Sequence, residues 1–146
     1  MKITDALLGE HGVFYAQFHH IEQSTPVLET RNEIVVQAEL LASALAIHAQ
    51  LEEELLFQPL DPHIGEMGPL LVMRGEHEEI EGTLDRIPHL DGVREVREQL
   101  VQIVGFARLH FAKEEQVLYP LAEQTLDEER LISLGSEWAT RRRVMI

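Results

Sequence analysis

Residues 48–53 are His-Ala-Gln-Leu-Glu-Glu, and residues 110–115 are His-Phe-Ala-Lys-Glu-Glu. An aromatic residue and a proline follow each copy, at residues 56–60 (Leu-Phe-Gln-Pro-Leu) and 118–121 (Leu-Tyr-Pro-Leu). The His and the first Glu of each copy are four positions apart, so on a helix they lie on the same face. The duplicated motif therefore predicts two helices that present matching His and Glu side chains.

A shorter motif, Gly-Glu-His, occurs at residues 9–11 and again at residues 75–77. The order along the chain is Gly-Glu-His, HxxxEE, Gly-Glu-His, HxxxEE, with similar gaps inside each half. A chain that repeats His and Glu at matching places is expected to build a site with internal two-fold symmetry. Four histidines and two carboxylates that meet on such an axis suit a pair of metal ions.

Proline and glycine residues divide the chain into helical stretches. Four long helices are expected at about residues 4–24, 29–57, 69–87 and 91–119, and a shorter fifth from about residue 127 to 134 or beyond. No segment alternates apolar and polar residues as a half-buried strand does. We therefore predict an all-α fold in a single domain, residues 1–146, with a bundle over about 4–121 and a C-terminal helical extension over about 126–146.

Apolar residues recur at three- and four-residue spacing along each long helix and predict a buried seam. The seams are interrupted by six polar residues, all from the repeated motifs: His11, His48, Glu52, His77, His110 and Glu114. A buried carboxylate without a compensating charge costs several kcal/mol. The nearest basic residue, Lys113, lies off the seam. Metal cations are therefore the predicted partners of Glu52 and Glu114.

Counting donors indicates which metals fit. If Glu52 and Glu114 both bridge, each of two ions receives two carboxylate oxygens and two imidazole nitrogens. A bridging oxo or hydroxo group supplies a fifth donor and leaves one position open. This mixed ligation favours iron or manganese over the closed tetrahedron of structural zinc. A nitrogen-rich site of this kind is expected to bind O2 or NO, or to sense redox state, rather than to mineralise iron.

The composition excludes several classes of protein. Cysteine is absent, so the chain offers no disulfide, thiolate metal site or iron–sulfur cluster ligand. The formal net charge of −14 repels nucleic acid and anionic membranes. Neither an apolar run of about 18 residues nor an apolar N-terminal signal core occurs. We expect a soluble, cytoplasmic protein that binds neither nucleic acid nor a membrane.

The order of the motifs resembles that of the hemerythrin-like, or HHE cation-binding, family. The similarity rests on H…HxxxE…H…HxxxE, with HxxxEE followed by an aromatic residue and proline, and it covers about residues 5–121. The resemblance implies an up-down-up-down four-helix bundle around two iron ions joined as Fe–O–Fe or Fe–OH–Fe, with manganese or zinc as substitutes. The ligands that it implies are His11, His48, Glu52, His77, His110 and Glu114.

Two residues beside the motifs have alternative roles. Oxygen-carrying members of the family have a fifth histidine, from an HxxxH pattern on the third helix. This chain has Glu81 one turn after His77, and Met73 one turn before it. Glu81 is either a further metal ligand or a solvated residue on the flank of the bundle. Tyr15 has the matching place in the first half, where it either packs in the core or donates a hydrogen bond or an electron near the metals.

Members of the family bind O2, sense iron or oxygen, or repair nitrosatively damaged iron–sulfur clusters. Our first hypothesis is a di-iron protein that binds or senses O2, NO or an oxidant, so that its partner is a small diatomic ligand or an oxidant. The alternative is a small di-iron oxidase, a peroxidase or an iron–sulfur-cluster repair factor. A third hypothesis is a zinc-binding or metal-free helical scaffold without redox activity. No residue is assigned a catalytic role, and no protein partner is predicted.

Overall fold

A computed structural model describes residues 1–65 and 68–145, so Ile146, at the end of the expected C-terminal extension, lies outside the described residues. The described residues form no strand, and the prediction of an all-α protein is confirmed. Their α-helices are α1 (Ile3–Ser24), α2 (Arg31–Glu52), α3 (Gln58–Ile64), α4 (Pro69–Arg86), α5 (Val93–Lys113), α6 (Tyr119–Thr125) and α7 (Glu128–Arg142).

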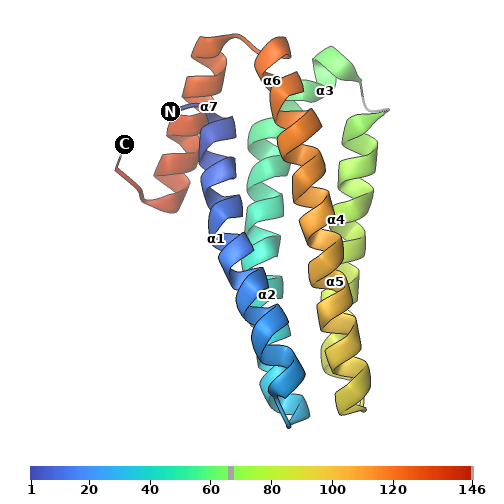
Figure 1. The fold of residues 1–146 in the computed structure, drawn as a ribbon. Helices are drawn as coiled ribbons and strands as arrows, with labels where there is room; N and C mark the ends of the chain where they lie inside the picture. The colour runs from blue at the N-terminus through green and yellow to red at the C-terminus, as the bar shows by residue number, and fades with distance from the viewer. Residues whose placement is uncertain (66–67, 146) are drawn as a thin grey trace.

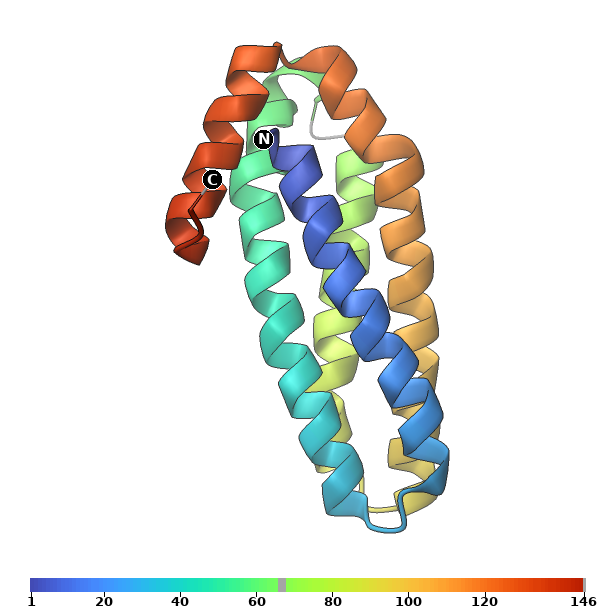
Figure 2. The same cartoon turned by 60° about the vertical axis from the view of Figure 1, so that its left-hand side comes forward.

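The four long helices α1, α2, α4 and α5 lie side by side (Figures 1 and 2). α2 contacts both α4 and α5, and α5 also contacts α1 and α4. The α1–α2 and α4–α5 connections lie at one end of the bundle, and α3 and α6 lie at the other (Figure 1). α7 packs outside the bundle against α1, near the N-terminus (Figure 2). The first HxxxE motif therefore lies on α2, and the second runs from the end of α5 to Glu114, the next residue. The two Gly-Glu-His motifs lie on α1 and α4.

Local sequence sets most helix boundaries close to those predicted. α2 begins after Thr30, which forms a capping box with Glu33: each side chain accepts a hydrogen bond from the backbone N–H of the other residue. Pro26 and Pro88 lie in single 3-10 turns that follow α1 and α4. The fifth expected helix continues through Gly135 to the end of α7.

The second and fourth long helices run on past their predicted ends. Two π-helical turns, Glu53–Phe57 and Glu114–Leu118, continue the chain from α2 into α3 and from α5 into α6. Proline was expected to stop both helices because it lacks an N–H and clashes with the carbonyl four residues earlier. Pro59 and Pro120 instead lie in the first turn of α3 and of α6, where the missing N–H costs little. The wider π-turn makes this continuation feasible.

Two apolar clusters fill the bundle on either side of one polar layer. The first includes Phe14, Phe18 and Phe111, and the second includes Leu55 and Leu70. Along each long helix the motif residues fall between the two clusters. The fold thus brings the residues of all four motifs to the same level of the bundle.

One stretch, Arg31–Ile64, is long and apolar enough to cross a membrane on length and composition alone. The apolar window of the stretch is 44% buried inside the fold, and core helices of non-membrane proteins meet the same criterion.

Candidate metal centre

Six polar side chains of the repeated motifs meet in the layer between the apolar clusters. They form two groups, His11, His48, Glu52 and Glu114, and His77, His110 and the same two glutamates. Within each group, one ligand atom from every residue lies within 4.8 Å of the others. The exposed fraction of the side chain is at most 1% for five of them and 13% for His77. Two adjacent cation positions with two shared carboxylates would use this arrangement.

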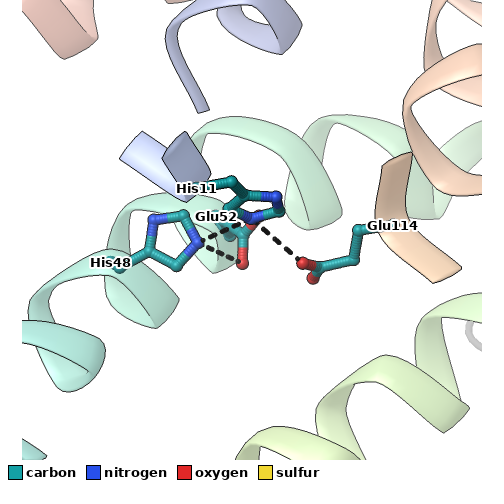
Figure 3. A group of neighbouring side chains, drawn as sticks. All are labelled: His11, His48, Glu52 and Glu114. Carbon is teal, nitrogen blue, oxygen red and sulfur yellow. Dashed lines mark hydrogen bonds and ion pairs between the residues drawn. The ribbon is translucent and has the colours of Figure 1, made fainter. Parts of the chain in front are cut away.

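Figure 3 shows how three segments supply the first group. His11 comes from α1, His48 and Glu52 from α2, and Glu114 from the π-turn after α5. Nε2 of His11 lies 3.3 Å from Oε2 of Glu114, and Nε2 of His48 lies 3.4 Å from Oε2 of Glu52. The polar atoms of all four side chains therefore converge on one point.

The second group has matching distances. Nε2 of His110 lies 3.1 Å from Oε1 of Glu114, and Nε2 of His77 lies 3.4 Å from Oε2 of Glu52. Each glutamate thus faces the histidine four residues earlier on its own helix and a second histidine from across the bundle. This is the placement that the HxxxE spacing predicts.

Two of the histidines use their other ring nitrogen on a glutamate at the edge of the layer. Nδ1 of His48 lies 2.7 Å from Oε2 of Glu10, and Nδ1 of His110 lies 2.9 Å from Oε2 of Glu76. Glu10 and Glu76 are the middle residues of the two Gly-Glu-His motifs. When Nδ1–H donates to a carboxylate, the tautomer is fixed and the Nε2 lone pair points into the layer, as in metal-ligating histidines.

The imidazole nitrogens and carboxylate oxygens that point into the layer include too few hydrogen-bond donors to satisfy one another. Nε2 of His11 lies 3.1 Å from Nε2 of His48, so two lone pairs face each other when both Nδ1 atoms carry the hydrogen. Among the described residues, both carboxylate oxygens of Glu114, Oε2 of Glu52 and Nε2 of His110 are buried without a hydrogen-bond partner. Buried polar atoms are normally satisfied. Cations between these nitrogens and oxygens would satisfy them, so the residues fit a pair of metal ions.

The layer also shifts the protonation of its own residues. Burial lowers the pKa of His77, but the nearby negatively charged carboxylates of Glu114 and Glu52 raise it more, to about 10. Burial raises the pKa of Glu114, yet the nearby imidazoles of His11, His110 and His77 bring it well below its ordinary value. The carboxylates therefore hold a proton on an imidazole when no metal is bound. A metal ion would displace this proton on binding.

The two halves differ in the glutamate that follows each HxxxE pair. Oε1 of Glu115 lies 2.9 Å from Nδ1 of His11 and accepts a hydrogen bond of 3.0 Å from the Tyr15 hydroxyl. Glu53, its counterpart in the repeat, accepts two hydrogen bonds of 2.8 and 2.9 Å from Arg74. The repeated sequence therefore supports a histidine in one half and forms a surface ion pair in the other.

Tyr119 is a second difference between the halves. Its hydroxyl donates a 2.8 Å hydrogen bond to Oε1 of Glu52 and lies 3.0 Å from Nε2 of His11. Burial and the charge of Glu52 raise the pKa of Tyr119, so the hydroxyl keeps its proton. Its counterpart is Phe57, whose ring stacks on that of His77 with the centroids 5.4 Å apart. A hydroxyl group is therefore placed beside the first group of ligands, and an apolar ring beside the second.

The two additional candidates have different places. Tyr15 reaches the layer through Glu115, as a hydrogen-bond donor beyond the ligands. Glu81 is exposed and belongs to neither group of ligand atoms. It lines a cavity of about 10 Å³, roughly the room that one water needs, together with Leu45, His48, Ala49, His77, Ile80, His110 and Phe111.

Sequence reasoning did not assign Glu10, Glu76, Glu115 or Tyr119 to the site. All four lie within the duplicated motifs, so repetition alone would have selected them. The apolar-seam criterion left them out because it selects residues that face the axis of the bundle. Glu10 and Glu76 reach the layer from its edge. Glu115 lies within a π-turn and Tyr119 directly after it, where the side chains point in other directions than a continuous α-helix would give them.

The hemerythrin HHE cation-binding domain model matches residues 2–90. Because this match covers more than half of the 146 residues, the chain belongs to the hemerythrin HHE cation-binding family. The match includes four of the six expected ligands. His110 and Glu114 lie beyond residue 90, but their ligand atoms lie within 4.8 Å of those of Glu52 and His77. Neither the curated proteins nor the solved structures gave a significant match.

Proposed function

We propose that this chain is a hemerythrin-like di-iron protein whose polar layer binds two iron ions and, through them, binds or senses O2, NO or an oxidant. The observation that carries the proposal is the pair of ligand groups that share both carboxylates. The ligands would be His11, His48, Glu52, His77, His110 and Glu114. Mixed imidazole and carboxylate donors favour iron or manganese over structural zinc. Two iron ions held there would supply redox chemistry and would bind a small ligand.

The residues of the chain have separate tasks in this proposal. Glu52 and Glu114 would each serve both ions, while Glu10 and Glu76 orient the imidazoles of the two HxxxE motifs. The Phe111 ring stacks on His11 with the centroids 3.8 Å apart and keeps water from the layer. The small cavity beside three of the histidines marks the side from which a diatomic molecule would reach the ions, after the cavity widens from its volume of about 10 Å³. Larger substrates would not fit there.

The remaining expectations belong to the same proposal. The alternating ends at which the long helices connect support an up-down-up-down bundle, and the paired motifs support an internal two-fold repeat (Figure 1). A single domain over residues 1–146, a cytoplasmic location and the absence of nucleic-acid partners are consistent with the composition and charge.

Metal analysis and absorption spectroscopy test this proposal. Protein loaded with iron without oxygen should hold two ions per chain, and exposure to air should give a stable band of an oxo-bridged or peroxo-bridged pair. One ion or fewer per chain, after full loading, would refute the two-ion centre. Protein that holds no iron and shows no chromophore would favour the third hypothesis, a zinc-binding or metal-free scaffold.

A catalytic function is the second candidate, and Tyr119 favours it. Its hydroxyl contacts a proposed bridging carboxylate and lies near a proposed ligand, so it can donate a proton at the centre. An oxidase, a peroxidase or a cluster-repair factor would use such a group. Steady consumption of O2 or H2O2 by the iron-loaded protein, reduced by Tyr119→Phe, would distinguish a catalyst from a sensor.

A further inference from the structure

Glu10 joins the metal centre to the C-terminal helix. Its Oε2 lies 2.7 Å from Nδ1 of His48, while its Oε1 accepts hydrogen bonds of 2.7 Å from Nε1 of Trp138 and of 2.7 Å from Nε of Arg142. Both donors come from α7. The two donors occupy one carboxylate oxygen and leave the other for the histidine. The orientation of Glu10, and through it that of His48, therefore depends on α7.

Gly135 allows α7 to lie close enough for these contacts. A Cβ atom at this position would be 3.0 Å from the backbone carbon of Lys2 and 3.1 Å from the backbone nitrogen of Ile3, and closer still to the carbonyl oxygen of Met1. These backbone atoms cannot move aside as the end of a side chain can. Arg141 of α7 also pairs with Glu54 in the π-turn that follows α2.

The other half of the repeat has no such link to a separate helix among the described residues. Glu76, the counterpart of Glu10, pairs with Lys113, which lies three residues after His110 on α5. The His110 side of the centre is thus completed within the bundle, whereas the His48 side is completed by α7.

We propose that Trp138 and Arg142 of α7 position the imidazole of His48 through Glu10. Docking of α7 against the bundle is then coupled to metal binding at the ion position beside His11 and His48. The inference rests on the proposed metal function. Outer partners of metal-bound histidines typically contribute 10–100-fold to metal affinity. Coupling between two sites is reciprocal, so bound metal must favour the docked state of α7 by the same factor.

Trp138 is the one tryptophan of the chain, so its fluorescence reports directly on α7. We suggest titrating metal-free, full-length protein with Zn²⁺, because this ion has no absorption that would quench the indole. In the wild type, Zn²⁺ should reduce the quenching of Trp138 by acrylamide. The Gly135→Ala variant should expose Trp138 and weaken one of the two Zn²⁺ sites about 10-fold, leaving the other near its wild-type affinity.

Gly105→Ala is the matched control, because a Cβ at Gly105 meets no atom within 4 Å and the position lies on α5. This variant should change neither the fluorescence nor the affinities. Both substitutions favour helix formation by a similar amount, so a difference between them reports on docking rather than on helix propensity.

Several outcomes would overturn the inference. An exposed Trp138 in Gly135→Ala with two unchanged Zn²⁺ affinities would show that α7 is not coupled to the centre, and equal weakening of both sites would show a general structural defect. If Gly135→Ala does not fold, Arg142→Gln serves instead, and unchanged Zn²⁺ binding there has the same meaning. A wild type that binds neither Zn²⁺ nor iron would refute the proposed function itself, whereas binding without coupling would refute only the role of α7.

Discussion

Glu52 and Glu53 are neighbours in sequence but have opposite surroundings. Glu52 is fully buried among the imidazoles, and Glu53 pairs with Arg74 at the flank. Because Glu52 belongs to both ligand groups, we expect the Glu52→Ala variant to lose both ions. Its metal affinity should fall by more than about 100-fold, which is the largest loss typical for a residue that only hydrogen-bonds a metal ligand. Glu53→Ala should keep both ions, because such ion pairs contribute about 0–1 kcal/mol to stability and nothing to the ligands. Metal analysis after iron loading measures both, and the reverse result would show that the helical register is wrong.

Glu115 has the same place in the repeat as Glu53, and both lie one residue off the apolar seam. The carboxylate of Glu115 contacts Nδ1 of His11, whereas that of Glu53 pairs with Arg74. We expect Glu115→Gln to lower iron affinity about 10–100-fold, measured by competition with a chelator. Glu53→Gln makes the same chemical change and should have no effect. Equal affinities in the two variants would remove Glu115 from the centre.

The sequence is compatible with two roles for Glu81, and the exposure of its side chain beside the small cavity favours the solvated role. We therefore expect Glu81→Gln to retain two ions and an unchanged spectrum. Glu81→His places an imidazole one turn after His77 and should slow oxidation by O2 or prolong an oxygen-bound intermediate. Glu78→His, at an exposed position of the same helix, is the control. Loss of iron in Glu81→Gln would show instead that Glu81 is a ligand.

The long helices and most of the site residues were predictable because the spacing of apolar residues indicates both. Apolar spacing located the long helices, and the same spacing identified the six polar residues that face the axis. The π-turns were not predictable from periodicity, because residues 53–57 and 114–118 have the composition of ordinary α-helix. Pro59 and Pro120 predict that each helix ends just before them. The π-turn instead moves Tyr119 toward the layer, which is why this residue was missed.

Docking of α7 could not be predicted for a different reason. Its helical character follows from the sequence, but the contact between Gly135 and the backbone of Met1–Ile3 joins opposite ends of the chain. Periodicity within a helix does not show which distant surface it will cover. The hydrogen bond from Trp138 to Glu10 likewise depends on tertiary packing.

Across the whole molecule, a buried polar layer interrupts the core and is unfavourable without cations. Metal that binds the native state alone adds its binding free energy to folding. At a free concentration about 100 times Kd, the gain is about 2.7 kcal/mol for each ion, or roughly 5–10 °C in Tm per ion for a chain of this size. Calorimetry of iron-loaded and chelator-treated protein should show this difference. Equal Tm values would mean that the layer does not hold metal in the folded state.

The size of this difference should depend on pH through His77. Although burial lowers the pKa of His77, Glu114 and Glu52 raise it from 6.5 to about 10 in metal-free protein. A group whose pKa is raised by folding stabilises the fold fully below its unfolded value and loses that contribution as the pH rises through the folded value. Metal-free protein should therefore lose stability between pH 6.5 and about 10, whereas bound metal replaces the proton and removes this dependence. The gap in Tm between metal-loaded and metal-free protein should widen across this window and stay nearly constant in His77→Gln. A constant gap in the wild type would show that the layer does not hold a proton on His77.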